Sequence, residues 1–208
     1  LGEGLSVYEG RQANPAWGMR MNPRFREMIL SDELTPISKL SGAFMSPESN
    51  VHLQFAYYES SLVVEHIVER FGLESIRKIL RDLSQGVKIN DAIAKHTEPM
   101  KKLEVAFAKY AKSKAEELAP ELEWDKPDPR ELRINIEELA KKHPKNFYIL
   151  SQQARRAINA RDWEAAKAHC RKLIKLFPRQ NGGANNPYVL LAKAHREMKE
   201  FSEEQKTL

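Results

Sequence analysis

The sequence predicts an all-α protein, with a helical bundle followed by a short array of helical hairpins. Apolar residues recur at spacings of three and four through most of the chain, as on the buried face of a helix. No run of alternating polar and apolar residues is flanked by turn dipeptides, so strands are not expected. A pattern also repeats at an interval of 34 residues near the C-terminus. The composition, 41% hydrophobic and 30% charged, is that of a globular protein.

The first part of the chain carries one helix pattern after another. Residues 10–50 are rich in Pro, Gly, Ser and Asn and should form loops with short helices. Gly72 and Gly86 are placed to end helices, and Asn90 is a candidate N-terminal cap. Four helices are therefore expected in order within 48–71, 73–86, 88–97 and 98–118.

A stretch with three prolines in ten residues, APELEWDKPDPRE, predicts a linker at 121–130 between domains at 1–120 and 131–208.

From Pro129 onward the chain has 17 basic against 9 acidic residues. Aromatic residues are not interleaved with these basic ones, as stacking on nucleic-acid bases would require. We interpret the basic residues as solvated helix faces and expect no nucleic-acid partner. No apolar run reaches the roughly 18 residues of a membrane helix, so no membrane span is expected.

The second domain contains an internal repeat. Pro144 and Pro178 stand 34 residues apart, after similar basic segments, and FYILSQQARRAIN resembles PYVLLAKAHREMK at an offset of 40. An insertion, RQNGGANN, accounts for the extra six residues, and we interpret it as a flexible loop. A period of about 34 residues made of two helices is typical of tetratricopeptide repeats, although a generic pair of helical hairpins is the alternative. One helix is expected at 131–143, a whole repeat at 147–177 and a partial one at 187–208.

Such repeats bind extended peptides or partner proteins in a concave groove lined by their first helices. The candidate groove residues are Asn146, Gln153, Arg156 and Lys193. The basic balance of this domain favours an acidic segment or a C-terminal carboxylate as the ligand.

The opening residues, LGEGLSVYEG, resemble the segment that supplies the third zinc ligand in gluzincin metallopeptidases related to aminopeptidase N. The resemblance puts Glu3 in the ligand position, and the small Gly4 after it would let this helix pack close to the HExxH helix. A second segment, FAYYESSLVVEHIVERFG, resembles the downstream helix of the same enzymes, whose tyrosine hydrogen-bonds the oxyanion. Tyr58 matches that tyrosine, with the adjacent Tyr57 as the alternative. Glu9 and Glu59 are weaker candidates, either for contacts that support the metal ligands or for contacts to a substrate amine.

The rest of a zinc site is missing from these residues. The six histidines, at 52, 66, 96, 143, 169 and 195, form no HExxH pair, and the single Cys170 excludes a multi-cysteine metal site. A catalytic zinc needs three protein ligands, so Glu3 cannot hold it alone. We expect the chain to be the C-terminal part of a larger zinc metallopeptidase whose HExxH precedes Leu1, and to bind no zinc and be inactive alone. The alternative is a non-catalytic scaffold of tetratricopeptide type.

Overall fold

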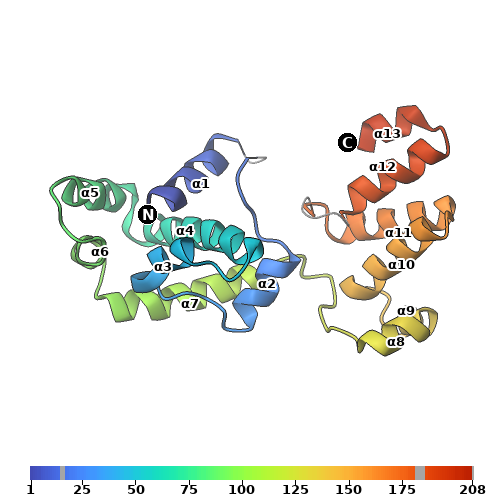
Figure 1. Cartoon of the computed structure of the whole chain (residues 1–208), viewed down its shortest axis with the longest axis horizontal. Coiled ribbons are helices and arrows are strands. Elements are labelled where there is room, and N and C mark those ends of the chain that lie inside the picture. Colours follow the sequence, from blue (N-terminus) through green and yellow to red (C-terminus); the bar gives the residue numbers. More distant parts are fainter. Residues whose placement is uncertain (15–16, 181–185, 208) are drawn as a thin grey trace. The chain divides into compact units, whose positions relative to one another are not determined.

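A computed structural model describes residues 1–14, 17–180 and 186–207 (Figure 1). Over these residues the chain forms thirteen α-helices and one 3-10 turn, and its extended pairing is limited to a bridge between Glu123 and Asn146. The predicted all-α class is confirmed. The chain divides into two compact units, Leu1–Leu118 and Ala119–Leu208. The loop interpretation of RQNGGANN falls largely on 181–185, outside the described residues.

The first unit is built around one long helix. Its elements are α1 (Gly2–Ala13), α2 (Pro23–Leu30), η1 (Ile37–Lys39), α3 (Leu40–Met45), α4 (Asn50–Phe71), α5 (Leu73–Ser84), α6 (Ile89–His96) and α7 (Met100–Glu116). Helix α4 lies between α1 and α7 and also contacts α3 and α5 (Figure 1). It is therefore buried on several sides, and Leu62, Val64 and Ile67 are at most 1% exposed.

Local signals explain where α4 begins and ends. The Ser49 hydroxyl accepts a hydrogen bond from the His52 amide, which caps the first turn. Gly72 ends the helix with φ +80°, a backbone conformation that glycine adopts without strain, while its amide donates to Val68. The Asn90 cap prediction is wrong: Asn90 lies inside α6, and its side-chain amide donates to the Ser38 carbonyl at 3.1 Å.

The second unit is a succession of short helices: α8 (Pro129–Ile134), α9 (Ile136–Lys142), α10 (Phe147–Asn159), α11 (Trp163–Leu176), α12 (Pro187–Glu197) and α13 (Phe201–Thr207). Helix α11 packs against both α10 and α12 (Figure 1). Ala154 and Ala166 are fully buried, as the repeat pattern predicts for helices that cross closely. The continuous helix expected at 131–143 is wrong, because the chain breaks at Asn135, between two β-branched isoleucines.

The predicted linker segment packs within the second unit. Leu122 is buried, and the Trp124 ring stacks on Phe147 at 4.9 Å between centroids. The Asn146 side chain donates to the Asp125 carbonyl at 2.7 Å. Asp128 then caps α8 by accepting from the Arg130 amide. Residues 122–128 are thus anchored by aromatic packing and backbone hydrogen bonds, which a proline count does not anticipate.

Candidate functional site

The two segments that resemble a zinc-peptidase site contact each other directly. Gly4 of α1 lies so close to α4 that an added Cβ atom would be 2.4 Å from the Ser60 carbonyl oxygen. No side chain fits at that distance, so glycine is required there. The sequence suggested Gly4 as the contact to an HExxH helix; among the described residues its close neighbour is Ser60.

Glu3 stands at the edge of an apolar cavity of about 290 Å³, here called the Glu3 cavity. Helices α3, α4 and α6 supply walls that include Phe44, Val63 and Ile93, and Ser60 lies among them. The Glu3 side chain itself is exposed. The N-terminal ammonium group of Leu1 lies close enough to interact with the Glu3 carboxylate, and the cavity beside them can accept an apolar group.

The adjacent tyrosines of α4 lie on different sides of the helix. Tyr58 is 2% exposed and its ring stacks on Phe25 at 5.1 Å, within the core. Burial raises the pKa of the Tyr58 hydroxyl above its usual value. Tyr57 is partly exposed and packs edge-on against Phe44, at 5.0 Å between centroids. Because Phe44 lines the Glu3 cavity, and because Tyr57 precedes Ser60 by three residues on a helix, Tyr57 is the tyrosine on the Glu3 side.

Among the described residues of the first unit, no histidine lines the Glu3 cavity. His66 is buried against the rings of Phe107 and Tyr110, and its pKa is lowered mainly by burial. His96 contacts Asp82 at 2.8 Å, and His52 contacts the Ser49 hydroxyl. Within the described part of the chain, no three His, Cys, Asp or Glu residues are grouped to hold a metal ion. The ligand role of Glu3 therefore remains a prediction from the sequence.

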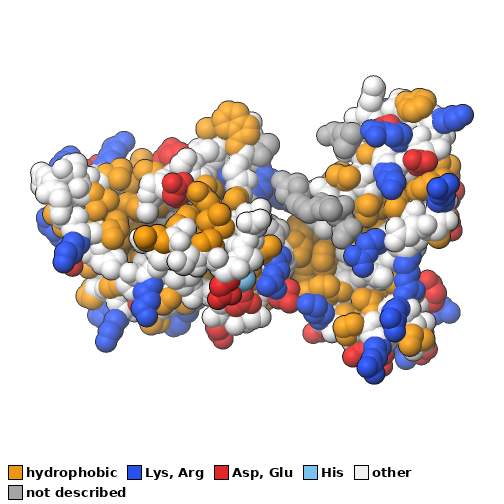
Figure 2. Space-filling model, viewed as in Figure 1, with side chains coloured by type: hydrophobic (Ala, Val, Ile, Leu, Met, Phe, Trp, Pro, Cys, Tyr) orange, Lys and Arg blue, Asp and Glu red, His pale blue; other side chains and the backbone are white. Residues whose placement is uncertain are grey.

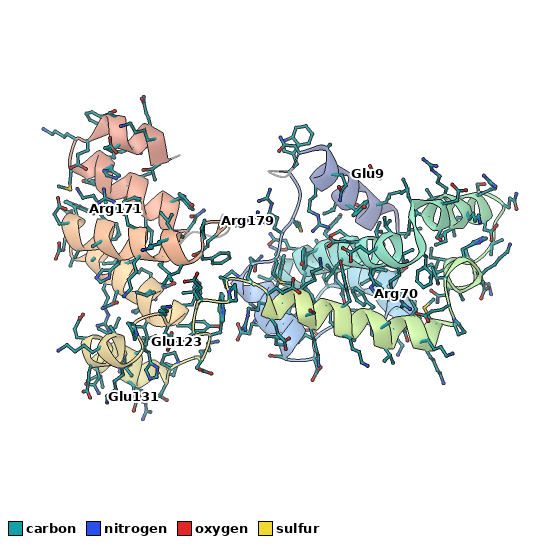
Figure 3. All side chains as sticks on the ribbon, turned by 180° about the vertical axis from the view of Figure 1, so that it is seen from behind. Glu9, Arg70, Glu123, Glu131, Arg171 and Arg179 are labelled. Atoms are coloured by element: carbon teal, nitrogen blue, oxygen red, sulfur yellow. The ribbon has the colours of Figure 1, made fainter. Side chains whose placement is uncertain are left out.

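An ion-pair network that the sequence did not suggest ties α1 to α4 and α7. Glu65 pairs with Arg11 of α1 and Lys114 of α7, and accepts from the Tyr110 hydroxyl at 2.8 Å. Burial alone would raise the pKa of Glu65, but the Tyr110 hydrogen bond and the charges of Arg11 and Lys114 hold it below its usual value. The network fixes the C-terminal end of α1, whereas Glu9 on the same helix is exposed (Figure 3).

Glu59, a weak candidate from sequence, is the most deeply buried carboxyl group of the first unit, at 1% exposure. One oxygen accepts from the Thr35 amide at 2.6 Å. Burial raises the pKa of Glu59 to about 8, although the Thr35 hydrogen bonds partly oppose this. Glu59 lines a second cavity of about 590 Å³, here called the Glu59 cavity, between residues 33–48 and α4. Its burial could not be read from the sequence, since it follows the packing of residues 33–48.

Three of the four predicted groove residues make contacts within the second unit. Asn146 is 2% exposed and caps α10 by accepting from the Tyr148 and Ile149 amides. Gln153 is buried, with its amide 3.5 Å from the Glu137 carboxylate. Arg156 donates to backbone carbonyls at the end of α8, including that of Leu132.

Lys193, the fourth, is exposed on α12. Asn146 and Gln153 are thus buried by contacts within the second unit, Arg156 is partly exposed, and Lys193 is the most exposed of the four.

Comparison with family models, with curated proteins and with solved structures finds no match to this chain. In the described residues, no helix is both long enough and apolar enough to cross a membrane.

Proposed function

We propose that the first unit belongs to a gluzincin-type zinc metallopeptidase domain, and that the second unit is a helical repeat module that binds a peptide or protein. The observation that carries the proposal is the contact of Gly4 with Ser60. It joins the segment resembling the third-ligand helix to the segment resembling the tyrosine helix. The two segments are far apart in sequence, and their contact places Glu3 beside α4, as the proposal requires.

In this proposal Glu3 is the third protein ligand of the zinc ion, and the two histidines come from an HExxH helix in sequence that precedes Leu1. Zinc in such a site activates a water molecule and polarises the substrate carbonyl. The chain's own contribution is to hold the Glu3 carboxylate in place through the close packing of α1 on α4. The Glu65 network fixes the other end of α1.

The proposed donor to the oxyanion is Tyr57 rather than Tyr58. A donor of this kind must reach the position where negative charge develops, beside the metal. Tyr57 shares a helix face with Ser60 and touches Phe44, and both of those residues line the Glu3 cavity. Neither tyrosine is among the residues that line the cavity, but Tyr57 touches its wall through Phe44, whereas Tyr58 is held in the aromatic core with Phe25 and Phe55.

The two tyrosines form a matched pair for testing the proposal. In a protein that includes the sequence encoded upstream of Leu1, Tyr57→Phe should lower kcat by about 10²–10³-fold, the usual cost of losing an oxyanion donor. Tyr58→Phe should leave kcat within a few-fold of wild type, since it removes only a hydroxyl in the core. Loss of activity in the Tyr58 variant alone would reverse the assignment, and equal activity in all three proteins would remove the proposed role from both.

A non-catalytic binding role is the second candidate, favoured by the hairpins of α10, α11 and α12 and by the exposed Lys193. Titration of the chain with an acidic peptide should then give binding that Lys193→Glu weakens. Binding that is unchanged by this charge reversal would place the ligand elsewhere, and no binding would remove the second candidate for this class of peptide.

A further inference from the structure

We propose that the Glu59 cavity is a binding site for a primary ammonium group, such as that of a lysine side chain or a peptide N-terminus. This site is separate from the Glu3 cavity. Glu59, Ala43 and His52 line the Glu59 cavity, whereas Glu3, Phe44 and Ser60 line the Glu3 cavity. The inference does not depend on the proposed zinc site.

The central observation is a buried carboxyl group that is only half paired. Glu59 Oε1 accepts from the Thr35 amide at 2.6 Å, whereas Glu59 Oε2 has no donor among the described residues. A buried polar atom without a partner is unfavourable, so most such atoms in folded proteins are paired. When Glu59 is ionised, the second oxygen lacks a donor, and the ammonium group is a compact donor of three hydrogen bonds.

The charges around the cavity favour a cation. Glu33 after α2 and Glu48 before α4 line it, and both lie within 4 Å of the His52 ring, at 3.8 Å and 3.5 Å. Lys39, at the end of η1, contributes a positive charge to the cavity lining. Figure 2 shows acidic side chains gathered beside a histidine on the side of the first unit that is in view. With Glu59 the lining holds three carboxyl groups against one lysine and one histidine.

The walls also suit an alkyl chain. Ala43, Phe55 and Ala56 contribute apolar surface beside Glu59. A lysine side chain presents four methylene groups below its ammonium group and so matches both the apolar wall and the carboxyl group. A bare divalent metal ion fits less well, because the described residues place no three metal-ligating side chains together.

Binding of a cation should be coupled to release of a proton. The pKa of Glu59 is about 8 because of burial, so the carboxyl group is mostly protonated at pH 7. An ammonium ion pairs with the ionised form, so its binding displaces that proton. Affinity should rise about tenfold between pH 7 and pH 9, since the fraction of ionised Glu59 rises by that factor while an alkylamine stays protonated. The Glu33, Lys39, Glu48 and His52 groups face the same cavity, so the variant comparison below is needed to isolate Glu59.

The test is titration of the 208-residue chain with n-butylamine at pH 7 and pH 9, following the Thr35 amide resonance by NMR. Half-saturation is expected on the order of millimolar to tens of millimolar, as befits a ligand of five heavy atoms. Glu59→Gln should weaken binding at pH 9 by at least about tenfold, because it keeps the shape but not the charge. Glu74→Gln makes the same chemical change on exposed α5 and should bind like wild type.

Two further arms separate specific recognition from simple apolar contact. n-Butanol, which lacks the charge, should not shift the Thr35 resonance. N-acetyl-lysinamide carries only a side-chain ammonium and triglycinamide only an α-ammonium, so comparing them at pH 7, where both groups are charged, identifies the natural source of the group. Equal binding of butylamine by wild type and Glu59→Gln, equal binding of butanol, or no binding at pH 9 would each overturn the proposal and leave Glu59 as a protonated core residue.

Discussion

Gly4 and Ser60 are packed backbone against backbone: a Cβ atom on Gly4 would lie 2.4 Å from the Ser60 carbonyl oxygen and 2.6 Å from its carbonyl carbon. The other two glycines of α1, Gly2 and Gly10, have open space where a Cβ atom would stand. One helix thus contains a glycine that the packing requires and two that it does not.

Gly4→Ala should destabilise the first unit, because the new methyl group forces α1 away from α4. Overpacking of this kind costs about 1–3 kcal/mol in the free energy of unfolding. Gly10→Ala, on the same helix, should instead stabilise the protein by about 0.5–1 kcal/mol, since alanine is the better helix former. Urea unfolding of the three proteins measures both effects. A Gly4→Ala protein as stable as Gly10→Ala would mean that α1 does not pack on α4 in this way.

The stabilising effect of Glu59 should decline as pH rises. Its pKa is about 8 in the folded protein, well above the ordinary glutamate value of 4.5, so the folded state holds a proton that the unfolded chain releases. This contribution is complete below about pH 4.5 and is lost as pH rises through about 8, with a slope of up to about 1.4 kcal/mol per pH unit in that window.

Glu59→Gln cannot titrate, so the stability difference between wild type and the variant isolates the effect. Wild type should lose stability relative to the variant between pH 5 and pH 8, as urea midpoints at several pH values would record. A difference that is constant over this range would show that Glu59 titrates normally. Glu33, Lys39, Glu48 and His52 face the same cavity and are present in both proteins, so their titration largely cancels.

Asn146 and Lys193 should behave differently when replaced. Asn146→Ala removes the cap of α10 and the hydrogen bond to Asp125, and should lower the unfolding free energy of the second unit by about 1–2 kcal/mol. Lys193→Ala should change stability by less than about 0.5 kcal/mol, because its side chain is exposed. Thermal unfolding by circular dichroism compares the two variants. If the Asn146→Ala protein were as stable as wild type but no longer bound the peptide, Asn146 would be a ligand-binding residue and not a structural cap.

Short-range signals in the sequence predicted most of the helices. The spacing of apolar residues located the long helix that became α4, and Gly72 marked its end because a backbone with positive φ suits glycine. The break at Asn135 was missed because no single residue there excludes a helix. The packing of residues 122–128 was missed because it depends on stacking of the Trp124 ring on Phe147, a residue distant in the sequence.

The candidate site was predicted only in part. Motif resemblance pointed to Glu3 and to a tyrosine on α4. It could not choose between Tyr57 and Tyr58, because the two differ only in their tertiary contacts. Tyr58 packs on Phe25, whereas Tyr57 packs on Phe44. The half-paired state of Glu59 depends on the Thr35 amide, 24 residues away in sequence, and no local pattern predicts such a contact.

The zinc content of a protein that includes the sequence encoded upstream of Leu1 tests the central claim most directly. Elemental analysis after removal of loosely bound metal should find one zinc per chain in wild type and in the control Glu9→Gln, whose side chain is exposed on the same helix. Glu3→Gln should lose most of that zinc, because in the proposed site the carboxylate is one of three ligands. An upstream sequence without HExxH, or zinc content that is the same in Glu3→Gln as in wild type, would contradict the assignment of Glu3.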